Sequence, residues 1–182
     1  MEKIFDTIIK NARLVRPNRA AIDMLDIGIK DGRVSRLNPN IRAELGREIV
    51  DAEGLLAFPG VVDAHMHTGI YAPLDQDAQS ESRAAASGGV TTSLNYMRTG
   101  QYYLNKGGAY RDFFPEVLGL SEGKFYVDYA YHLAPMSQEH IEEMPELVEK
   151  FGVNSFKIFM FYGGHGLHGH SQNQNEFLIG AG

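Results

Sequence analysis

The chain has 182 residues, of which 43% are hydrophobic and 22% charged, and its formal net charge at pH 7 is −6. This composition is typical of a globular protein, and the negative charge argues against nucleic acid or an anionic membrane surface as a partner. The sequence contains no cysteine, which excludes disulfides, cysteine-ligated zinc and thiol catalysis. Any metal must therefore be held by histidine, carboxylate or a modified side chain.

The N-terminal residues mix charged and apolar side chains and lack the uninterrupted apolar core of a signal peptide. No apolar run in the sequence is long enough to cross a bilayer. The sequence therefore predicts a cytoplasmic protein.

Residues 1–58 are expected to form a small antiparallel β-sheet domain. Asp31-Gly32 separates two runs that favour strands, and it indicates a two-residue hairpin because such a turn requires positive φ. Glu53-Gly54 predicts a second turn of this kind, and Pro59-Gly60 ends the domain. The expected strands cover residues 26–30, 33–37, 48–51 and 55–58.

From residue 59 onward, expected strands alternate with expected helices, which indicates βα units and a mostly parallel sheet. Gly88-Gly89 ends one helix, and Pro145 begins another that Gly152 ends. Four such strands are half of an eight-stranded barrel, whose usual length is about 250 residues. Residues 59–182 are therefore expected to be the first half of a barrel in a longer protein. The expected strands cover 61–67, 90–97, 125–133 and 155–161, and the helices 78–87 and 145–151.

The first of these strands ends in the motif Asp63-Ala64-His65-Met66-His67. Residues two apart on a strand point to the same face, so Asp63, His65 and His67 are expected to share one side. Two imidazoles at this spacing suit a transition-metal ion such as zinc. The alternative is a pair of solvated or hydrogen-bonded residues at a strand exit. Their position favours the metal site, because parallel-barrel enzymes carry catalytic groups at the carboxyl ends of strands.

Lys157 lies within the apolar run 155–161, where burial of an ammonium group is costly. One interpretation is that the lysine reaches the rim of the strand or a solvated face. The other is that desolvation lowers its pKa and makes the neutral amine a nucleophile.

Taken together, these motifs resemble the cyclic amidohydrolases, which include dihydropyrimidinase, hydantoinase, allantoinase and dihydroorotase. The resemblance is greatest to the first two, and it covers residues 1 to about 162. It implies an α/β fold, namely the N-terminal part of a TIM-like (β/α)8 metallohydrolase barrel preceded by a small β-sandwich domain. The domains would be 1–58 and 59–182. The resembling motifs are residues 59–67, 86–92 and 152–160.

The resemblance implies that His65 and His67 bind one ion of a pair of divalent metals, expected to be zinc. Lys157 would react with carbon dioxide to form a carbamate that bridges both metals, which replaces a cation by an anionic oxygen ligand. Tyr162 would hold substrate and stabilise the oxyanion, or it is simply a phenol that caps the strand exit. The implied reaction is the opening of a hydantoin- or dihydropyrimidine-like ring by a metal-bridged hydroxide.

The remaining metal histidines and the catalytic aspartate of the family lie on later strands, which have no counterpart in this sequence. Three histidines in the segment 163–170 follow Lys157 too closely to replace them. They are expected in a loop at the mouth of the site, or as an adventitious metal-binding tract. The 182-residue chain by itself is therefore expected to be inactive. The three histidines are His165, His168 and His170.

Four other polar side chains near strand ends have more than one interpretation. Asp63 could orient a metal-bound histidine, or it could be a surface acid. His132 fits a hydrogen-bonded core histidine better than a site residue. Asn95 and Tyr96 could line the pocket.

The leading hypothesis is a hydrolase of cyclic amide C–N bonds that binds a small cyclic amide and assembles as a homo-oligomer, either a dimer or a tetramer. An allantoinase or a dihydroorotase-type amidohydrolase is the alternative within the family. A non-catalytic scaffold with the same fold is the alternative from another class, because fold does not fix function. The retained ligand residues favour the enzyme.

Overall fold

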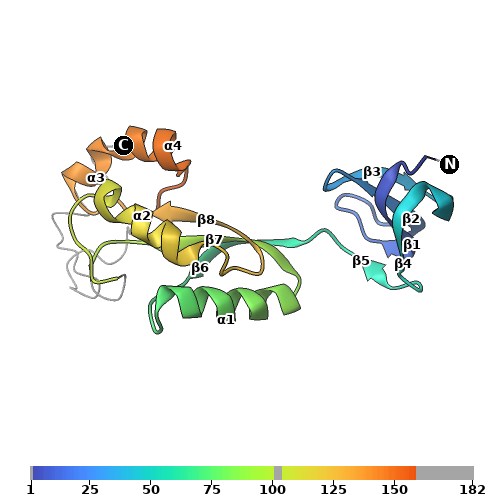
Figure 1. The fold of residues 1–182 in the computed structure, drawn as a ribbon, viewed down its shortest axis with the longest axis horizontal. Coiled ribbons are helices and arrows are strands. Elements are labelled where there is room, and N and C mark those ends of the chain that lie inside the picture. The colour runs from blue at the N-terminus through green and yellow to red at the C-terminus, as the bar shows by residue number, and fades with distance from the viewer. Residues whose placement is uncertain (1, 101–103, 159–182) are drawn as a thin grey trace. The chain divides into compact units, whose positions relative to one another are not determined.

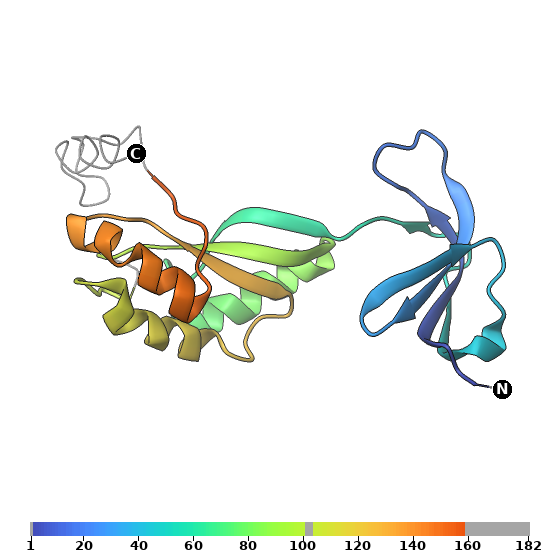
Figure 2. The same ribbon diagram turned by 90° about the horizontal axis from the view of Figure 1, so that it is seen from above.

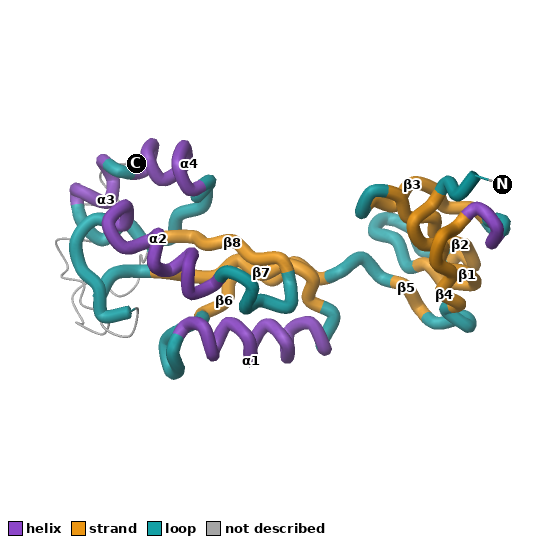
Figure 3. The backbone as a smooth tube through the Cα atoms, viewed as in Figure 1, coloured by secondary structure: helices purple, strands orange, loops and turns teal. Residues whose placement is uncertain are grey.

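The structure is a computed structural model that describes residues 2–100 and 104–158. The chain forms two compact units, Met1–Pro59 and Gly60–Gly182 (Figure 1). The first contains strands and one short 3-10 helix, η1 (Ala43–Leu45), whereas the second combines strands with α-helices (Figure 3). Among the helices of the described residues, none has the length and apolar character that crossing a bilayer requires.

The sheet of the first unit is organised around the ten-residue strand β1 (Phe5–Leu14). On one side of β1, β2 (Asp23–Lys30) and β3 (Arg33–Asn38) form the predicted antiparallel hairpin. Its turn residues Asp31 and Gly32 have φ angles of 50° and 69°, as a two-residue turn of this kind requires. The hairpin prediction is therefore confirmed.

The prediction of a purely antiparallel sheet is wrong. Both β4 (Gly46–Asp51) and β5 (Leu56–Ala57) run parallel to β1 and pair with it. Glu53 and Gly54, at φ angles of 51° and 78°, turn the chain between two segments that pair with the same strand. The sheet is mixed because β1, which no turn signal reveals, supplies the partner for both segments.

A buried carboxylate ties three parts of the first unit together. Asp26 is 2% exposed, and its side chain accepts hydrogen bonds from Lys10 Nζ at 2.5 Å and from the backbone N–H groups of Asn11 and Ile41 at 2.9 and 2.7 Å. Burial raises the pKa of this carboxyl, but the hydrogen bonds and the charge of Lys10 outweigh it and lower the pKa overall. The carboxylate is thus fully satisfied where it is buried.

The second unit contains a parallel sheet in the order β6-β7-β8, which confirms the predicted βα units. Helix α1 connects the first two strands and α2 the next two, and both helices lie along the same side of the sheet (Figure 2). The strands are β6 (Val61–His67), β7 (Val90–Met97) and β8 (Asp128–Leu133). The helices are α1 (Leu74–Ser87), α2 (Tyr110–Ser121), α3 (Gln138–Glu142) and α4 (Met144–Phe151).

The side of the sheet that carries the helices holds the main apolar core. Leu133 at the end of β8, Val117 of α2 and Leu147 of α4 are all fully buried in it. Helix α4 has Pro145 in its first turn and ends at Gly152, whose φ is 68°, as predicted. Since the helices cover one side, the side chains on the other side are available for a site.

Only the beginning of the predicted fourth strand, residues 155–161, lies within the described residues. Phe156 forms an isolated parallel bridge with Leu133, and the N–H of Lys157 donates to the carbonyl of Leu133 at 2.9 Å. This pairing continues the order of the sheet beyond β8, and it brings Lys157 to the carboxyl ends of the strands. Residues 159–161 lie outside the described residues.

Candidate metal centre

His65 and His67 lie at the carboxyl end of β6 with their rings in contact. Their Nε2 atoms are 3.0 Å apart, and the ring centroids are 4.8 Å apart in an edge-to-face arrangement. Two nitrogens bound to one tetrahedral zinc ion at about 2.05 Å are about 3.3 Å apart. The two histidines therefore fit a shared ion after a movement of a few tenths of an ångström.

Lys157 points at the same place. Its Nζ is 2.7 Å from Nε2 of His65 and 4.8 Å from the centroid of the Tyr96 ring. Burial lowers the pKa of this half-buried lysine. Burial, and after it the charge of Lys157, also lowers the pKa of His65, against the opposing effect of Asp63. These shifts favour the neutral amine and the neutral imidazole, which are the forms with a lone pair to offer.

His132 of β8 and Tyr96 of β7 complete a row across the sheet. In the strand register, His67 is level with Tyr96, and Tyr96 is level with His132. Nε2 of His132 is 2.8 Å from Nδ1 of His65. Burial, followed by the charges of His65 and Lys157, lowers the pKa of His132 to about 4, so its ring is neutral at pH 7.

The strand that carries the histidines is irregular. Three residue steps on β6, from Asp63 to Met66, face two steps on β7, from Ser93 to Asn95, which is the pattern of a β-bulge. The bulge interrupts the simple alternation that predicts a common face for Asp63 and both histidines. In the structure, Asp63 Oδ1 accepts the backbone N–H of His65 at 3.1 Å, so the carboxylate holds the backbone at the bulge.

A buried polar network lies just beyond the histidines. The Thr68 hydroxyl donates to Asn95 Oδ1 at 2.6 Å, and Asn95 Nδ2 donates to the Ser93 hydroxyl at 3.1 Å. All three side chains are buried, so these hydrogen bonds satisfy polar groups within the sheet. Tyr96, the other residue considered for the pocket wall, does face the histidines, with its ring centroid 4.8 Å from that of His67.

Within residues 2–100 and 104–158, no group of three or more histidine, aspartate or glutamate side chains is arranged to hold a metal ion. The two ring nitrogens of His65 face different neighbours, Nδ1 toward His132 and Nε2 toward His67. The described residues thus supply part of a donor set: two histidines and one lysine. Other residues considered from the sequence lie outside the described part, namely Tyr162, His165, His168 and His170.

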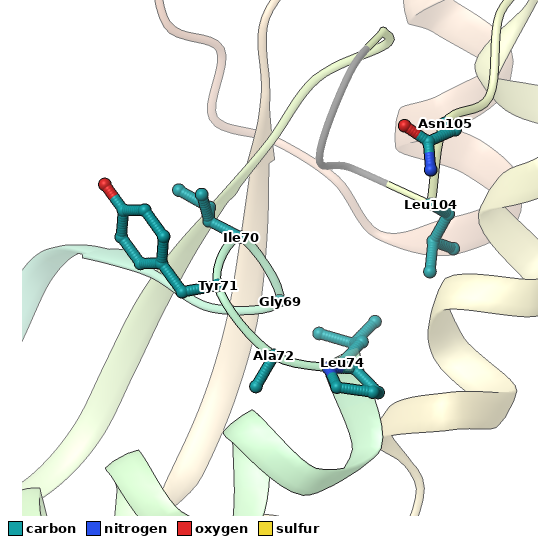
Figure 4. Close-up of a pocket in the computed structure, with 8 residues that line it drawn as sticks. Gly69, Ile70, Tyr71, Ala72, Leu74, Leu104 and Asn105 are labelled. Atoms are coloured by element: carbon teal, nitrogen blue, oxygen red, sulfur yellow. The ribbon is translucent and has the colours of Figure 1, made fainter.

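A cavity of about 500 Å³ opens beside the loop that leaves β6, with Leu104 and Asn105 across from that loop (Figure 4). Asp77 of α1 accepts the N–H of Gly69 at 2.6 Å and so ties the loop to the helix that follows. Because the loop starts at the carboxyl end of β6, the cavity belongs to the same end of the sheet as the histidines. Its lining residues are Gly69, Ile70, Tyr71, Ala72, Pro73, Leu74, Leu104 and Asn105.

No protein-family model matches the chain, but individual proteins do. It is 32% identical to a D-hydantoinase of Geobacillus stearothermophilus over 160 residues, which are 85% of this chain and 32% of that protein. It is 34% identical to a D-hydantoinase of Rhizobium radiobacter over 164 residues, which are 87% of this chain and 34% of that protein. The chain therefore spans about a third of the length of these relatives.

Solved structures give the same result. A crystal structure of a D-hydantoinase matches with a TM-score of 0.74 and 26% identity, over 92% of this chain and 35% of that one. The L-hydantoinase (dihydropyrimidinase) from Arthrobacter aurescens matches with a TM-score of 0.71 and 27% identity, over 93% of this chain and 36% of that one. The predicted fold class is confirmed: the chain is the N-terminal part of a TIM-like barrel preceded by a small β-sandwich domain.

Proposed function

Because the chain is homologous to the N-terminal third of the hydantoinase-like cyclic amidohydrolases, we propose that it supplies one side of the active site of an enzyme that opens cyclic amides. The substrate would be a hydantoin- or dihydropyrimidine-like ring, and the enzyme a homo-oligomer. The observation that carries the proposal is the convergence of His65, His67 and Lys157 within hydrogen-bonding distance at the strand ends. Three nitrogen side chains from two distant segments have little reason to meet there except to bind a common group.

In this proposal His65 and His67 each offer Nε2 to one divalent ion, with zinc expected because imidazole nitrogens suit it. The Lys157 amine attacks carbon dioxide, forms an N–C bond and loses a proton, which yields a carbamate with anionic oxygens for two ions. When bound, a metal pair of this kind supplies hydroxide at neutral pH and polarises the amide carbonyl. The neutral form of Lys157 is the reactive one in this step, because the attack requires the nitrogen lone pair.

The other side chains have supporting roles. The ring of Tyr96 packs beside the histidines, with its centroid 5.8 Å from that of His65 and 4.8 Å from that of His67. Tyr162 would donate its hydroxyl to the carbonyl oxygen as negative charge develops there. The mostly apolar cavity beside Gly69–Leu74 is large enough for a substituent on the ring.

The relatives are about three times as long as this chain, and its described residues carry only part of a donor set. We therefore expect the 182 residues alone to show no hydrolysis. A non-catalytic scaffold with this fold needs no such cluster of nitrogens, so the geometry of His65, His67 and Lys157 favours the enzyme.

The test uses the full-length protein that contains this chain, with hydantoin, dihydrouracil, allantoin and dihydroorotate as substrates and with metal analysis of the purified enzyme. We expect bound divalent metal, hydrolysis of one of the first two substrates, and loss of activity by about 10³-fold or more in Lys157→Ala, which equals about 4 kcal/mol. Lys150→Ala is the matched control, because Lys150 is an exposed lysine paired with Glu146 on α4. A metal-free protein whose activity survives Lys157→Ala would overturn the proposal.

A further inference from the structure

We propose that His132 is a positioning residue that holds the His65 ring by its Nδ1 and thereby directs Nε2 of His65 at the metal. The inference rests on the proposed function and adds to it a residue that the sequence pattern favours as part of the core. Its basis is the pair of contacts on opposite sides of the His65 ring. Nδ1 lies 2.8 Å from His132 Nε2, and Nε2 lies 3.0 Å from His67 Nε2.

The positions of the protons follow from these contacts. A neutral imidazole has one N–H and one lone pair, and only the nitrogen with the lone pair can bind a metal. If Nε2 of His65 faces the metal, its proton is on Nδ1 and is donated to Nε2 of His132. His132 must then accept through Nε2 and carry its own proton on Nδ1. Metal-binding histidines commonly use their second nitrogen in this way, and loss of the partner weakens metal binding.

The surroundings of His132 hold its side chain firmly in place. It is 7% exposed, and its neighbour Leu133 is fully buried in the main core. The ring of Tyr96 meets the His132 ring edge-on at a centroid distance of 5.9 Å. Strand β8, which carries His132, pairs with β7 in an unbroken register of six residues.

His65 has the opposite surroundings. It is exposed on β6, at the bulge where the register with β7 is interrupted. The Asp63 carboxylate holds its backbone N–H, but a backbone contact leaves the ring free to rotate about χ1 and χ2. The ring is held by its contacts with His132, His67 and Lys157, and of these three only His132 is buried, so it is the most firmly held partner of the ring.

The same contacts argue against His132 as a metal ligand. Its Nε2 is directed at His65 Nδ1, whereas the nitrogen of His65 that faces His67 is Nε2, so an ion shared by His65 and His67 lies on the other side of the His65 ring from His132. His132 therefore acts through His65.

The test compares His132→Gln with His132→Leu in the full-length protein at a fixed pH. Glutamine keeps an acceptor oxygen near the position of Nε2, whereas leucine keeps the volume and removes the acceptor. We measure zinc affinity by chelator competition and the visible absorption of the cobalt(II)-substituted protein. His132→Leu is expected to weaken zinc binding about 10- to 100-fold and to alter the cobalt spectrum. His132→Gln is expected to keep both close to those of the unmodified protein.

His140→Gln is the matched control. His140 is also a buried histidine of this unit, with Nδ1 accepting the N–H of Met136 at 2.9 Å and Nε2 2.9 Å from the Gly108 carbonyl. Its replacement should reduce the midpoint of thermal unfolding and leave zinc affinity unchanged. Equal zinc affinity in His132→Leu and the unmodified protein would overturn the inference. Failure of the unmodified protein to bind zinc would instead count against the proposed function.

One measurement needs no variant. Long-range ¹H–¹⁵N NMR of the unmodified protein distinguishes the two neutral tautomers of a histidine. We expect the Nδ1–H form for both His65 and His132, and an Nε2–H form of His65 would overturn the inference even if every variant failed to fold.

Discussion

Two polar clusters of this protein, one around Asp26 in the first unit and one around His65 in the second, are built in opposite ways. In the first unit, the buried Asp26 carboxylate meets a lysine and two backbone N–H groups, so opposite partners match. In the second unit, nitrogens face nitrogens: the closest contacts of His65 are His67, His132 and Lys157. A matched cluster stabilises a fold, whereas a cluster of lone-pair donors at a strand end is better suited to receive a cation. The Asp26 cluster therefore serves the fold, whereas the His65 cluster is suited to the proposed metal site.

The largest effect that sharpens this comparison is expected for Lys157→Met. Activity of the full-length enzyme should fall about 10³-fold or more, as in the alanine variant. The free energy of unfolding should stay unchanged or rise by about 1 kcal/mol, because a methionine removes a half-buried ammonium group from among imidazoles. Urea unfolding and the hydrolysis assay measure the two quantities. A clear loss of stability would show that this cluster holds the fold together after all.

The reverse result is expected for Asp26→Leu, which should lower the free energy of unfolding by about 3 kcal/mol. The change leaves the Lys10 ammonium group and two backbone N–H groups without their acceptor. Zinc affinity should not change. Urea unfolding with Glu48→Gln, an exposed carboxylate on β4, as the control tests this, and a loss no larger than that of the control would contradict it.

A smaller effect is expected from acid. The pKa of Asp26 is lower in the folded protein than in the unfolded chain. Its contribution to stability is therefore fully present above the unfolded value of about 4 and is lost as the pH falls through the lower folded value. Unfolding free energies between pH 5 and pH 2 should fall less steeply in Asp26→Asn than in the unmodified protein. If the unfolding free energies of the two proteins fell in parallel with pH, Asp26 would not be the source of this acid sensitivity.

Local signals in the sequence predict the second unit better than the first. Strand β7 matches its expected bounds, and α1 ends at the expected glycines, because period-2 patterns and helix stop signals act over short distances. Strand β1 escapes prediction since a register shift between Ile9 and Ala12, with Asn11 at a φ of 56°, breaks its alternation. The parallel pairing of β4 with β1 depends on contacts about 40 residues apart, which turn residues do not encode.

The candidate site shows the same division. His65 and His67 are recognisable because they are two residues apart on one strand, and Lys157 because it interrupts an apolar run. The contact between His65 and His132 spans 67 residues and appears only when the parallel strands are assembled. The available signal is that His132 lies one residue before the end of β8, at the same edge of the sheet as His65 and His67. A core histidine fits that signal equally well. Helix α2 contains Pro115 and Gly119, residues that disfavour helix, so packing rather than propensity decides it.

Between the pairs Asp63–Ser93 and Met66–Asn95, β6 contains one more residue than β7. Since side chains on a strand alternate between faces, the extra residue leaves Asp63 on the face of Ser93 and Asn95 and His67 on the opposite face, level with Tyr96. On a regular strand the same sequence would put the Asp63 carboxylate on the face of both histidines. A protein engineer who transplants the motif onto a regular strand must therefore carry over the irregular pairing as well, because otherwise an extra carboxylate joins the two imidazoles.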